Sequence, residues 1–165
     1  EDRKDSLSYY NSAIQQYLEI IDCKYSRYHN QQTDILVNLG IAKSYIGIGG
    51  ITGEFKKIQS GIDIIQSIID KIDPHLDKPL FRESLSLLSD AIKEKYDLTT
   101  RVSDLEDAIR VYDEYIFVND SMREFDPVMP RVKVSQLLIQ LGEQGRGTKK
   151  KKKANDYLKY ALDYI

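Results

Sequence analysis

The chain has 165 residues, of which 41% are hydrophobic and 30% charged, a balance that excludes wholesale disorder and suits one domain with a buried core. Its formal net charge is −2, and five positive charges stand together at Lys149–Lys153, so the remainder carries −7, five units lower. A generally basic nucleic-acid-binding surface is thereby excluded. No run of eighteen apolar residues is seen, so we expect no membrane-spanning segment.

The N-terminal residues and the cysteine content bear on where the protein works. The chain opens EDRKDS, without a starting methionine or a signal-peptide pattern, and we expect it to be a fragment of a larger protein. Its one cysteine, Cys23, cannot form an internal disulfide, so nothing favours an oxidising compartment. We therefore expect an intracellular, cytoplasmic location.

An internal repeat organises the second half of the sequence. The stretch Leu85–Ile116 aligns without a gap on Val134–Ile165 after a shift of 49 residues. Residue class is shared along the alignment, as in the pairs Leu85 with Val134, Ser86 with Ser135, Leu88 with Leu137, Ile92 with Leu141 and Ile109 with Leu158. A repeat of this length is typical of stacked helical hairpins, so we expect an all-α fold, an α-solenoid of antiparallel hairpins.

Apolar residues at three- and four-residue spacing predict the helices of the N-terminal half. We expect a first helix over residues 7–21, which we interpret as the second half of a hairpin because its pattern matches that of residues 108–116. After a polar connection, Thr33 or Asp34 is the expected N-cap of a helix over 34–46. The glycine-rich stretch Gly47–Gly53 is expected to end that helix as a flexible hairpin turn.

The same spacing predicts helices at residues 55–72, 80–96, 103–118, 128–141, and from the lysine run to the C-terminus. Ser103 is the expected N-cap of the fifth helix, with Glu106 completing a capping box. We thus expect one domain over residues 1–165 with about seven helices. It comprises a half hairpin at 1–23 and three hairpins, each with a long loop between its helices, at 33–73, 79–119 and 128–165.

The segment LSDAIKEKYDLTTRVSDLEDAIRVYDEYI, which begins at Leu88, resembles a tetratricopeptide repeat. The Leu-Gly-x-Ala of that family's first helix resembles Leu39-Gly40-Ile41-Ala42, echoed by Leu88-Ser89-Asp90-Ala91. The small residue of the second helix matches Ala108, and Gly61 in the preceding copy. The period is about 48 residues instead of 34, with the extra residues expected inside each hairpin. Such repeats are similar to those beside caspase-like CHAT peptidase domains and in related bacterial and fungal arrays.

The resemblance implies a scaffold that binds a peptide or a partner helix in a concave groove. The family's dicarboxylate clamp is absent, because Asn38 would be accompanied by Ser86, Leu87, Asp90 and Lys93 in place of lysines, asparagine and arginine. From repeat geometry, the residues expected to line the groove are Asn38, Ile41, Tyr45, Ser86, Asp90, Glu94, Ser135 and Ile139.

No catalytic, metal-binding or cofactor-binding constellation assembles in the sequence. Gly47–Gly53 lacks both the last glycine of a dinucleotide loop and a preceding strand. The two histidines, His29 and His75, are far apart, and no Ser–His or Cys–His motif nominates a nucleophile. The carboxylates of the fifth helix are expected on a solvated face: Asp104, Glu106, Asp107, Asp113 and Glu114.

The lysine run Lys149–Lys153 has two interpretations. It could form an anion site for nucleic acid, acidic lipid or an acidic partner, or it could be a solvated loop, because five lysines near a helix N-terminus oppose the helix dipole. Most of the twelve tyrosines recur in core register and are expected to pack with their hydroxyls at the edge.

Our functional expectation is a non-catalytic protein–protein interaction scaffold without a cofactor. Two alternatives remain open: a regulatory repeat region of a CHAT-type peptidase or another effector, and a polyanion- or RNA-binding module that uses Lys149, Lys150, Lys151, Lys152 and Lys153.

Overall fold

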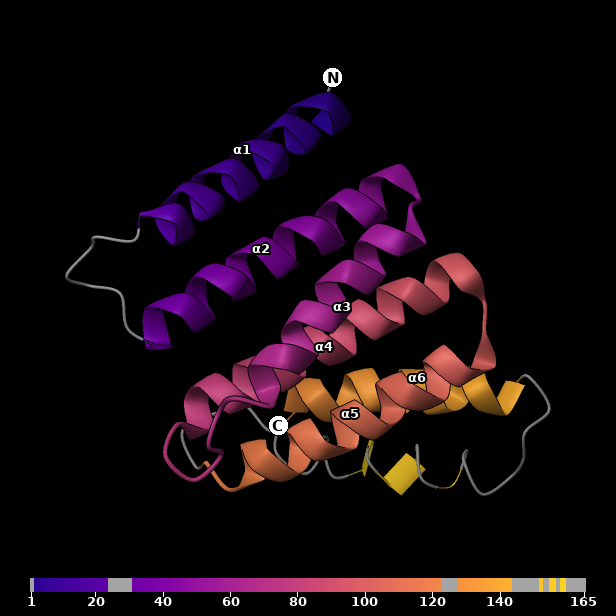
Figure 1. Ribbon diagram of the computed structural model, residues 1–165. Helices are drawn as coiled ribbons and strands as arrows, with labels where there is room; N and C mark the ends of the chain where they lie inside the picture. Colours follow the sequence, from indigo (N-terminus) through magenta and orange to yellow (C-terminus); the bar gives the residue numbers. More distant parts are fainter. Residues whose placement is uncertain are drawn as a thin grey trace.

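A computed structural model describes residues 2–23, 31–122 and 128–143, together with the isolated positions 152, 155, 156, 158 and 159. These residues form helices and turns without a strand, which confirms the all-α prediction. Six helices lie in this part of the chain (Figure 1): α1 Asp2–Asp22, α2 Gln31–Thr52, α3 Phe55–Ile69, α4 Lys78–Thr99, α5 Val102–Asp120 and α6 Val128–Glu143. We expected about seven, and the region of the seventh lies outside the described residues apart from the isolated positions.

The helices stack in chain order, each against the next (Figure 1). Packing is most extensive between α2 and α3 and between α4 and α5. These two pairs are therefore whole hairpins. The α1, α3 and α5 helices each pack on the helix that follows, and α2 also contacts α4.

Each hairpin closes through a turn of two residues. In the first, Gly53 follows α2 with a φ of 75° and Glu54 leads into α3. In the second, Thr100 follows α4 with a φ of 54° and Arg101 leads into α5. The prediction of long inner loops is wrong for these two hairpins, and the inner loop of the third, predicted over 128–165, lies outside the described residues. The residues beyond the usual repeat length lie largely in the helices, since α2 and α4 have 22 residues each.

The glycines of Gly47–Gly53 do not end α2 where the sequence predicts, because the helix continues to Thr52. Packing explains the difference. A Cβ on Gly47 would lie 2.5 Å from the ring of Tyr10, and one on Gly49 would lie 2.5 Å from the side chain of Ile58. Each glycine costs a helix about 1 kcal/mol relative to alanine, and close contact with a neighbouring helix offsets that cost.

The two hairpins are related by a shift of 47 residues. Their first helices begin at Gln31 and Lys78 and have equal length. The buried positions of their second helices also coincide at this shift: Ile58 with Leu105, Gly61 with Ala108, Ile62 with Ile109, and Ile65 with Tyr112. The sequence comparison matched Leu39-Gly40-Ile41-Ala42 to Leu88-Ser89-Asp90-Ala91 at a shift of 49 residues. That shift differs by two residues from the one that relates the two hairpins in the structure. At the 47-residue shift, buried Ile41 corresponds to buried Leu88.

The 49-residue repeat correctly predicts inner faces farther along the chain. Leu85, Leu88 and Ile92 on α4 are buried, as are their partners Val134, Leu137 and Leu141 on α6. Of the partners of α5, beyond residue 143, only isolated positions are described, and Leu158, the partner of Ile109, is helical and half-buried.

Polar contacts fix the start of α5, although not through the capping box that we expected. The N-cap is Arg101, and Ser103 lies inside the helix. Asp104 is buried instead of solvated, because it accepts a hydrogen bond from Thr99 at 2.7 Å and pairs with Lys95 at 2.9 Å. Burial alone would raise the pKa of Asp104, but Thr99 and Lys95 outweigh it and lower that pKa below 3.8. The ionised Asp104 carboxylate therefore stabilises the fold at pH values above 3.8, its ordinary pKa. This stabilisation is lost as the pH falls through the lowered pKa of the folded protein.

Two further expectations concern α2. It begins at Gln31, so Thr33 and Asp34 lie in its first turn instead of at its N-cap. Its length and apolar composition also match those of a membrane-crossing helix, contrary to our expectation of no such segment, and 44% of its most apolar stretch is buried inside the protein. A core helix of a soluble protein passes the same test, so the match is weak support for a membrane span.

The turn geometry generates a test of the paired hairpins. Thr100→Gly should raise the free energy of unfolding by about 0.5–1 kcal/mol, because a β-branched residue is strained at positive φ and glycine is not. Gly53→Ala should lower it by about 1 kcal/mol through φ alone, since an added Cβ would meet nothing within 4 Å. Urea denaturation of both variants measures the two effects. A loss of stability in Thr100→Gly would contradict the assigned turn.

Candidate functional site

The eight groove residues predicted from sequence all lie on the first helices of hairpins, α2 and α4, or on α6. Asp90 and Ile139 are exposed, and four are half-buried: Asn38, Tyr45, Ser86 and Glu94. Ile41 and Ser135 are buried within the chain, so these two cannot line a groove that a partner enters. Ile41 occupies the core position that Leu88 occupies one hairpin later, and the hydroxyl of Ser135 donates to the carbonyl of Arg131 at 2.7 Å.

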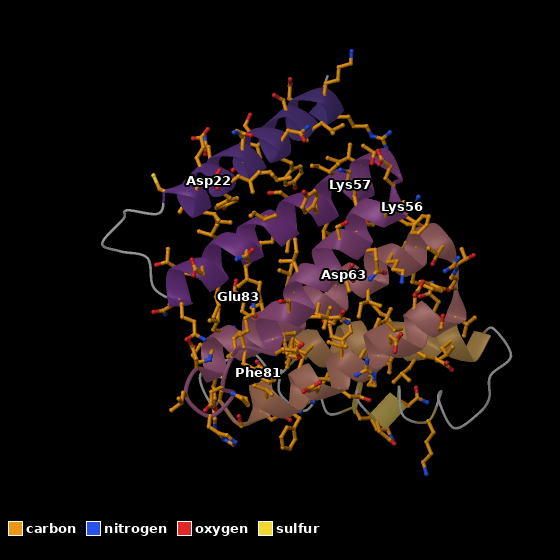
Figure 2. The ribbon with its side chains drawn as sticks, viewed as in Figure 1. Asp22, Lys56, Lys57, Asp63, Phe81 and Glu83 are labelled. Carbon is orange, nitrogen blue, oxygen red and sulfur yellow. The ribbon has the colours of Figure 1, made fainter. Side chains whose placement is uncertain are left out.

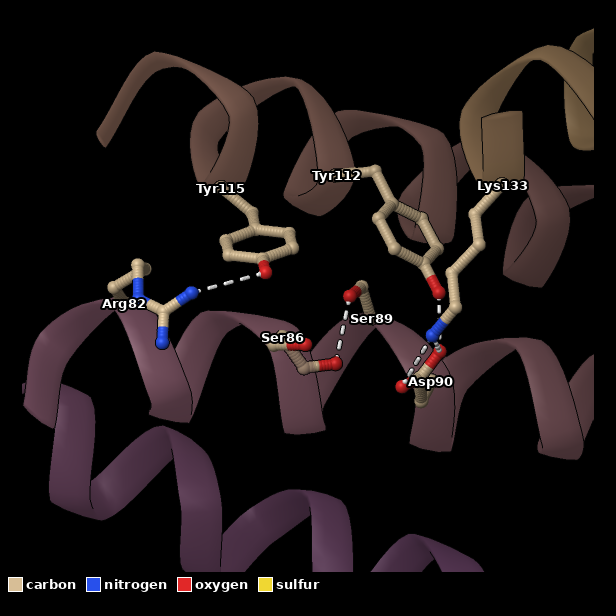
Figure 3. Close-up of polar contacts among 7 residues, drawn as sticks. All are labelled: Arg82, Ser86, Ser89, Asp90, Tyr112, Tyr115 and Lys133. Carbon is tan, nitrogen blue, oxygen red and sulfur yellow. Dashed lines mark hydrogen bonds and ion pairs between the residues drawn. The ribbon is translucent and has the colours of Figure 1, made fainter. Parts of the chain in front are cut away.

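Asp90, one of the predicted groove residues, lies at the centre of a polar cluster between α4, α5 and α6 (Figure 3). Its carboxylate accepts a hydrogen bond from the hydroxyl of Tyr112 on α5. It also accepts from the ammonium of Lys133 on α6, at 2.8 and 2.9 Å to its two oxygens. The same ammonium lies 5.9 Å from the centroid of the Tyr112 ring, within the range of a cation–π contact. One carboxylate thus connects three helices.

Tyr112 is a core residue that carries a polar group to the surface. Its side chain is 2% exposed, and it is among the tyrosines that we expected to pack with the hydroxyl at an edge. Burial raises the pKa of Tyr112, and the adjacent Asp90 carboxylate raises it further. The hydroxyl therefore remains a protonated donor to Asp90 at any ordinary pH.

A second polar cluster lies two turns earlier on α4. The guanidinium of Arg82 donates to the hydroxyl of Tyr115 at 3.4 Å and to the side-chain oxygen of Asn119 at 3.3 Å. It also lies 5.9 Å from the centroid of the Tyr115 ring. Figure 3 shows Arg82, Ser86 and Asp90 following one another along α4 below the tyrosines of α5. The α4–α5 boundary therefore presents a cation at one end and a carboxylate at the other.

The Asp90 end opens into a small cavity of about 260 Å³. Three helices line it, through Asp90, Lys93, Tyr112, Lys133, Gln136 and Leu137. Lys93 pairs with Asp97 on its own helix. The cavity thus combines two ammonium groups, one carboxylate and an amide over an apolar floor, a set suited to hydrogen bonding with a peptide.

Contacts between α2 and α4 bring the first helices of the two hairpins onto one side. Lys43 on α2 pairs with Glu83 on α4 at 3.1 Å (Glu83 is labelled in Figure 2). Farther along, a Cβ on Gly50 would lie 2.8 Å from a carboxylate oxygen of Glu94. Both groups of the Lys43–Glu83 pair are half exposed, so the pair contributes little to stability, but it shows which faces adjoin.

The described residues bring no catalytic arrangement together. Within the described ranges, no three His, Cys, Asp or Glu side chains lie close enough to hold a metal ion. Cys23 is exposed at the end of α1, and His75 is exposed in the α3–α4 connection. His29 lies outside the described residues. Of Lys149–Lys153, only Lys152 is described, as helical and exposed.

The sequence analysis did not identify two residues of these polar clusters, Arg82 and Lys133. Both pair with residues more than thirty positions away, and spacing along one helix carries no signal for such contacts. One indication was available for Lys133. The 49-residue repeat aligns Lys133 with Ser84, which is fully buried. A lysine at a position that is buried in the other copy indicates that the two copies pack differently there.

No family model, no curated protein and no solved structure matches the chain.

The Asp90 contacts generate a test by denaturation. Asp90→Asn keeps an acceptor for Tyr112 and loses only a half-exposed ion pair, so it should cost under about 1 kcal/mol. Asp90→Leu also removes the acceptor of a buried hydroxyl and should cost about 1–3 kcal/mol. Adding Tyr112→Phe to Asp90→Leu should recover part of that loss, because both partners are then apolar. Equal costs for Asn and Leu would show that the hydrogen bond from Tyr112 contributes nothing.

Proposed function

We propose that the chain is a non-catalytic protein–protein interaction scaffold, a tetratricopeptide-like solenoid that binds a peptide or a partner helix. The binding surface would be the side that carries the Lys43–Glu83 pair between α2 and α4 and the Asp90–Lys133 pair between α4 and α6, which we call the first-helix face. The tetratricopeptide resemblance in the sequence suggests this architecture. The observation that carries the proposal is the 47-residue correspondence between two hairpins that have first helices of equal length and two-residue turns that both begin at positive φ.

The correspondence supports a shared binding side in a simple way. Successive equivalent hairpins place equivalent helices next to each other, and the Lys43–Glu83 and Asp90–Lys133 pairs join α2 to α4 and α4 to α6. Both polar and apolar side chains lie on that side, with half-buried Glu94 and exposed Ile139 among them. A partner could gain both burial of apolar surface and hydrogen bonds there.

The polyanion-binding alternative draws no support from the described contacts. It rests on Lys149–Lys153, and the one described member, Lys152, is an exposed helical residue. The scaffold proposal needs none of these lysines.

Peptides selected from a display library by binding to the chain would test the proposed face. Ile139→Asp and Glu94→Lys should each raise the Kd of a selected peptide by at least about tenfold, the effect of losing roughly 1.4 kcal/mol at a binding contact. Phe117→Asp is the matched control, because Phe117 is 79% exposed on a second helix, α5. It should leave the Kd unchanged. Titration calorimetry gives the three values, and peptides insensitive to both first-helix variants would contradict the proposal.

A further inference from the structure

A larger hollow lies at the junction between the two hairpins. It has a volume of about 390 Å³ and lies between the beginning of α2, the connection from α3 to α4 and the first turn of α4. Across Gln31, Ile35 and Lys71 it adjoins a groove of about 380 Å³ between α2 and α3. We call the two together the junction cavity, lined by Gln31, Gln32, Asp34, Ile35, Asn38, Asp63, Ile64, Ser67, Ile68, Lys71, Ile72, Asp73, Leu76, Asp77 and Leu80.

The junction cavity has an apolar floor and an apolar side chain at its mouth. Ile35, Ile72 and Leu80 lie in the floor and are each nearly buried. Leu76 is 86% exposed, although the connection that carries it is ordered. The amide of Leu76 donates to the carbonyl of Asp73 at 3.1 Å, and the amide of Asp77 donates to the same carbonyl at 3.0 Å. Backbone hydrogen bonds therefore hold a leucine in solvent beside an apolar cavity.

The charge around this apolar lining is predominantly negative. Four carboxylates line the junction cavity and a single lysine, Lys71, opposes them; the carboxylates are those of Asp34, Asp63, Asp73 and Asp77. Asp63 accepts from Gln59, Asp73 from the amide of His75, and Asp77 from the amide of Leu80 as the N-cap of α4. Asp63, Asp73 and Asp77 form no ion pair with any other described residue, so no cation in the described part of the chain is paired with them.

We propose that the junction cavity binds a segment of a partner protein in which a large apolar side chain is flanked by lysine or arginine. The apolar side chain would fill the floor between Ile35, Ile72 and Leu80 and contact Leu76. The flanking cations would pair with Asp63 and Asp73, which no cation of the described chain neutralises. Charge complementarity selects this partner over an acidic one, because like charges placed against each other at an interface cost several kcal/mol.

This second surface is separate from the first-helix face, and of the eight groove residues predicted from sequence it contains only Asn38. A junction cavity that bound its peptide would leave the first-helix proposal open, and its failure would not affect that proposal. Different variants test the two proposals, because neither Leu76 nor Asp63 lies on the first-helix face.

Two amphipathic peptides of matched length supply the test with the full chain. One has leucines on one helical face and lysines on the other, and its twin has glutamates in place of the lysines. The lysine peptide should bind in fluorescence anisotropy, with an affinity that falls as salt rises, and the glutamate peptide should not. Leu76→Ser and Asp63→Lys should each weaken binding of the lysine peptide at least fivefold, by roughly 1 kcal/mol or more; Asp63 is labelled in Figure 2.

Matched controls separate the cavity from a general attraction of a basic peptide to an acidic protein. Phe117→Ser removes a comparably exposed apolar residue, and Asp107→Lys reverses a comparably exposed charge, both on α5. Neither should change the affinity, and backbone amide signals of Ile35 and Ile72 should shift on titration. All four variants alter exposed side chains and should unfold at the temperature of the parent chain. The proposal is overturned if the lysine peptide fails to bind, if both peptides bind alike, or if the α5 controls weaken binding as much as the cavity variants.

Discussion

The close approach of neighbouring helices to α2 is the constraint on which the rest of the structure depends. Tyr17 and Tyr10 of α1 are seven residues apart, and they lie on Gly40 and Gly47 of α2, which are also seven apart. A Cβ on Gly40 would lie 2.3 Å from the Tyr17 ring, and one on Gly47 would lie 2.5 Å from the Tyr10 ring. No side chain larger than hydrogen fits at either position unless the tyrosine moves. The two antiparallel contacts fix both the direction and the register of α1 on α2.

The same device joins α2 to α3. A Cβ on Gly61 would lie 2.9 Å from the carbonyl oxygen of Ala42, so the two backbones approach closely at this point. In the second hairpin, Ala108 takes the place of Gly61 and Ser89 that of Ala42, and both are buried. At two other core positions a tyrosine adds a hydroxyl group, because Tyr112 replaces Ile65 and Tyr115 replaces Ile68. The hydroxyl groups thus gained reach Asp90 and Arg82, and the core of the second hairpin thereby acquires a polar edge, which Lys133 of α6 contacts at Asp90.

The sequence predicted the helical class and most of the inner faces, because apolar spacing within one helix is a local signal. Leu85 and Leu88 on α4 and Val134 on α6 illustrate its success. The glycines of α2 illustrate its limit, since their propensity favours a turn and contacts with Tyr10 and Ile58 override it. The candidate site was predicted less completely than the fold. Asp90 was identified from repeat geometry, but its pairing with Lys133 arises from the docking of α6, which no local pattern records.

The central claim is that α2 continues through its glycines to Thr52 and joins α3 by a two-residue turn. Amide hydrogen exchange across α2 and this turn tests the claim most directly. If α2 is continuous to Thr52, the amides of residues 49–52 should exchange slowly, at rates comparable to those of residues 39–42, because both sets are hydrogen-bonded in one packed helix. Protection should lapse at the two-residue turn and resume within α3. Fast exchange throughout residues 47–54, as in a flexible loop, would contradict the account of α2 and with it the 47-residue equivalence of the hairpins.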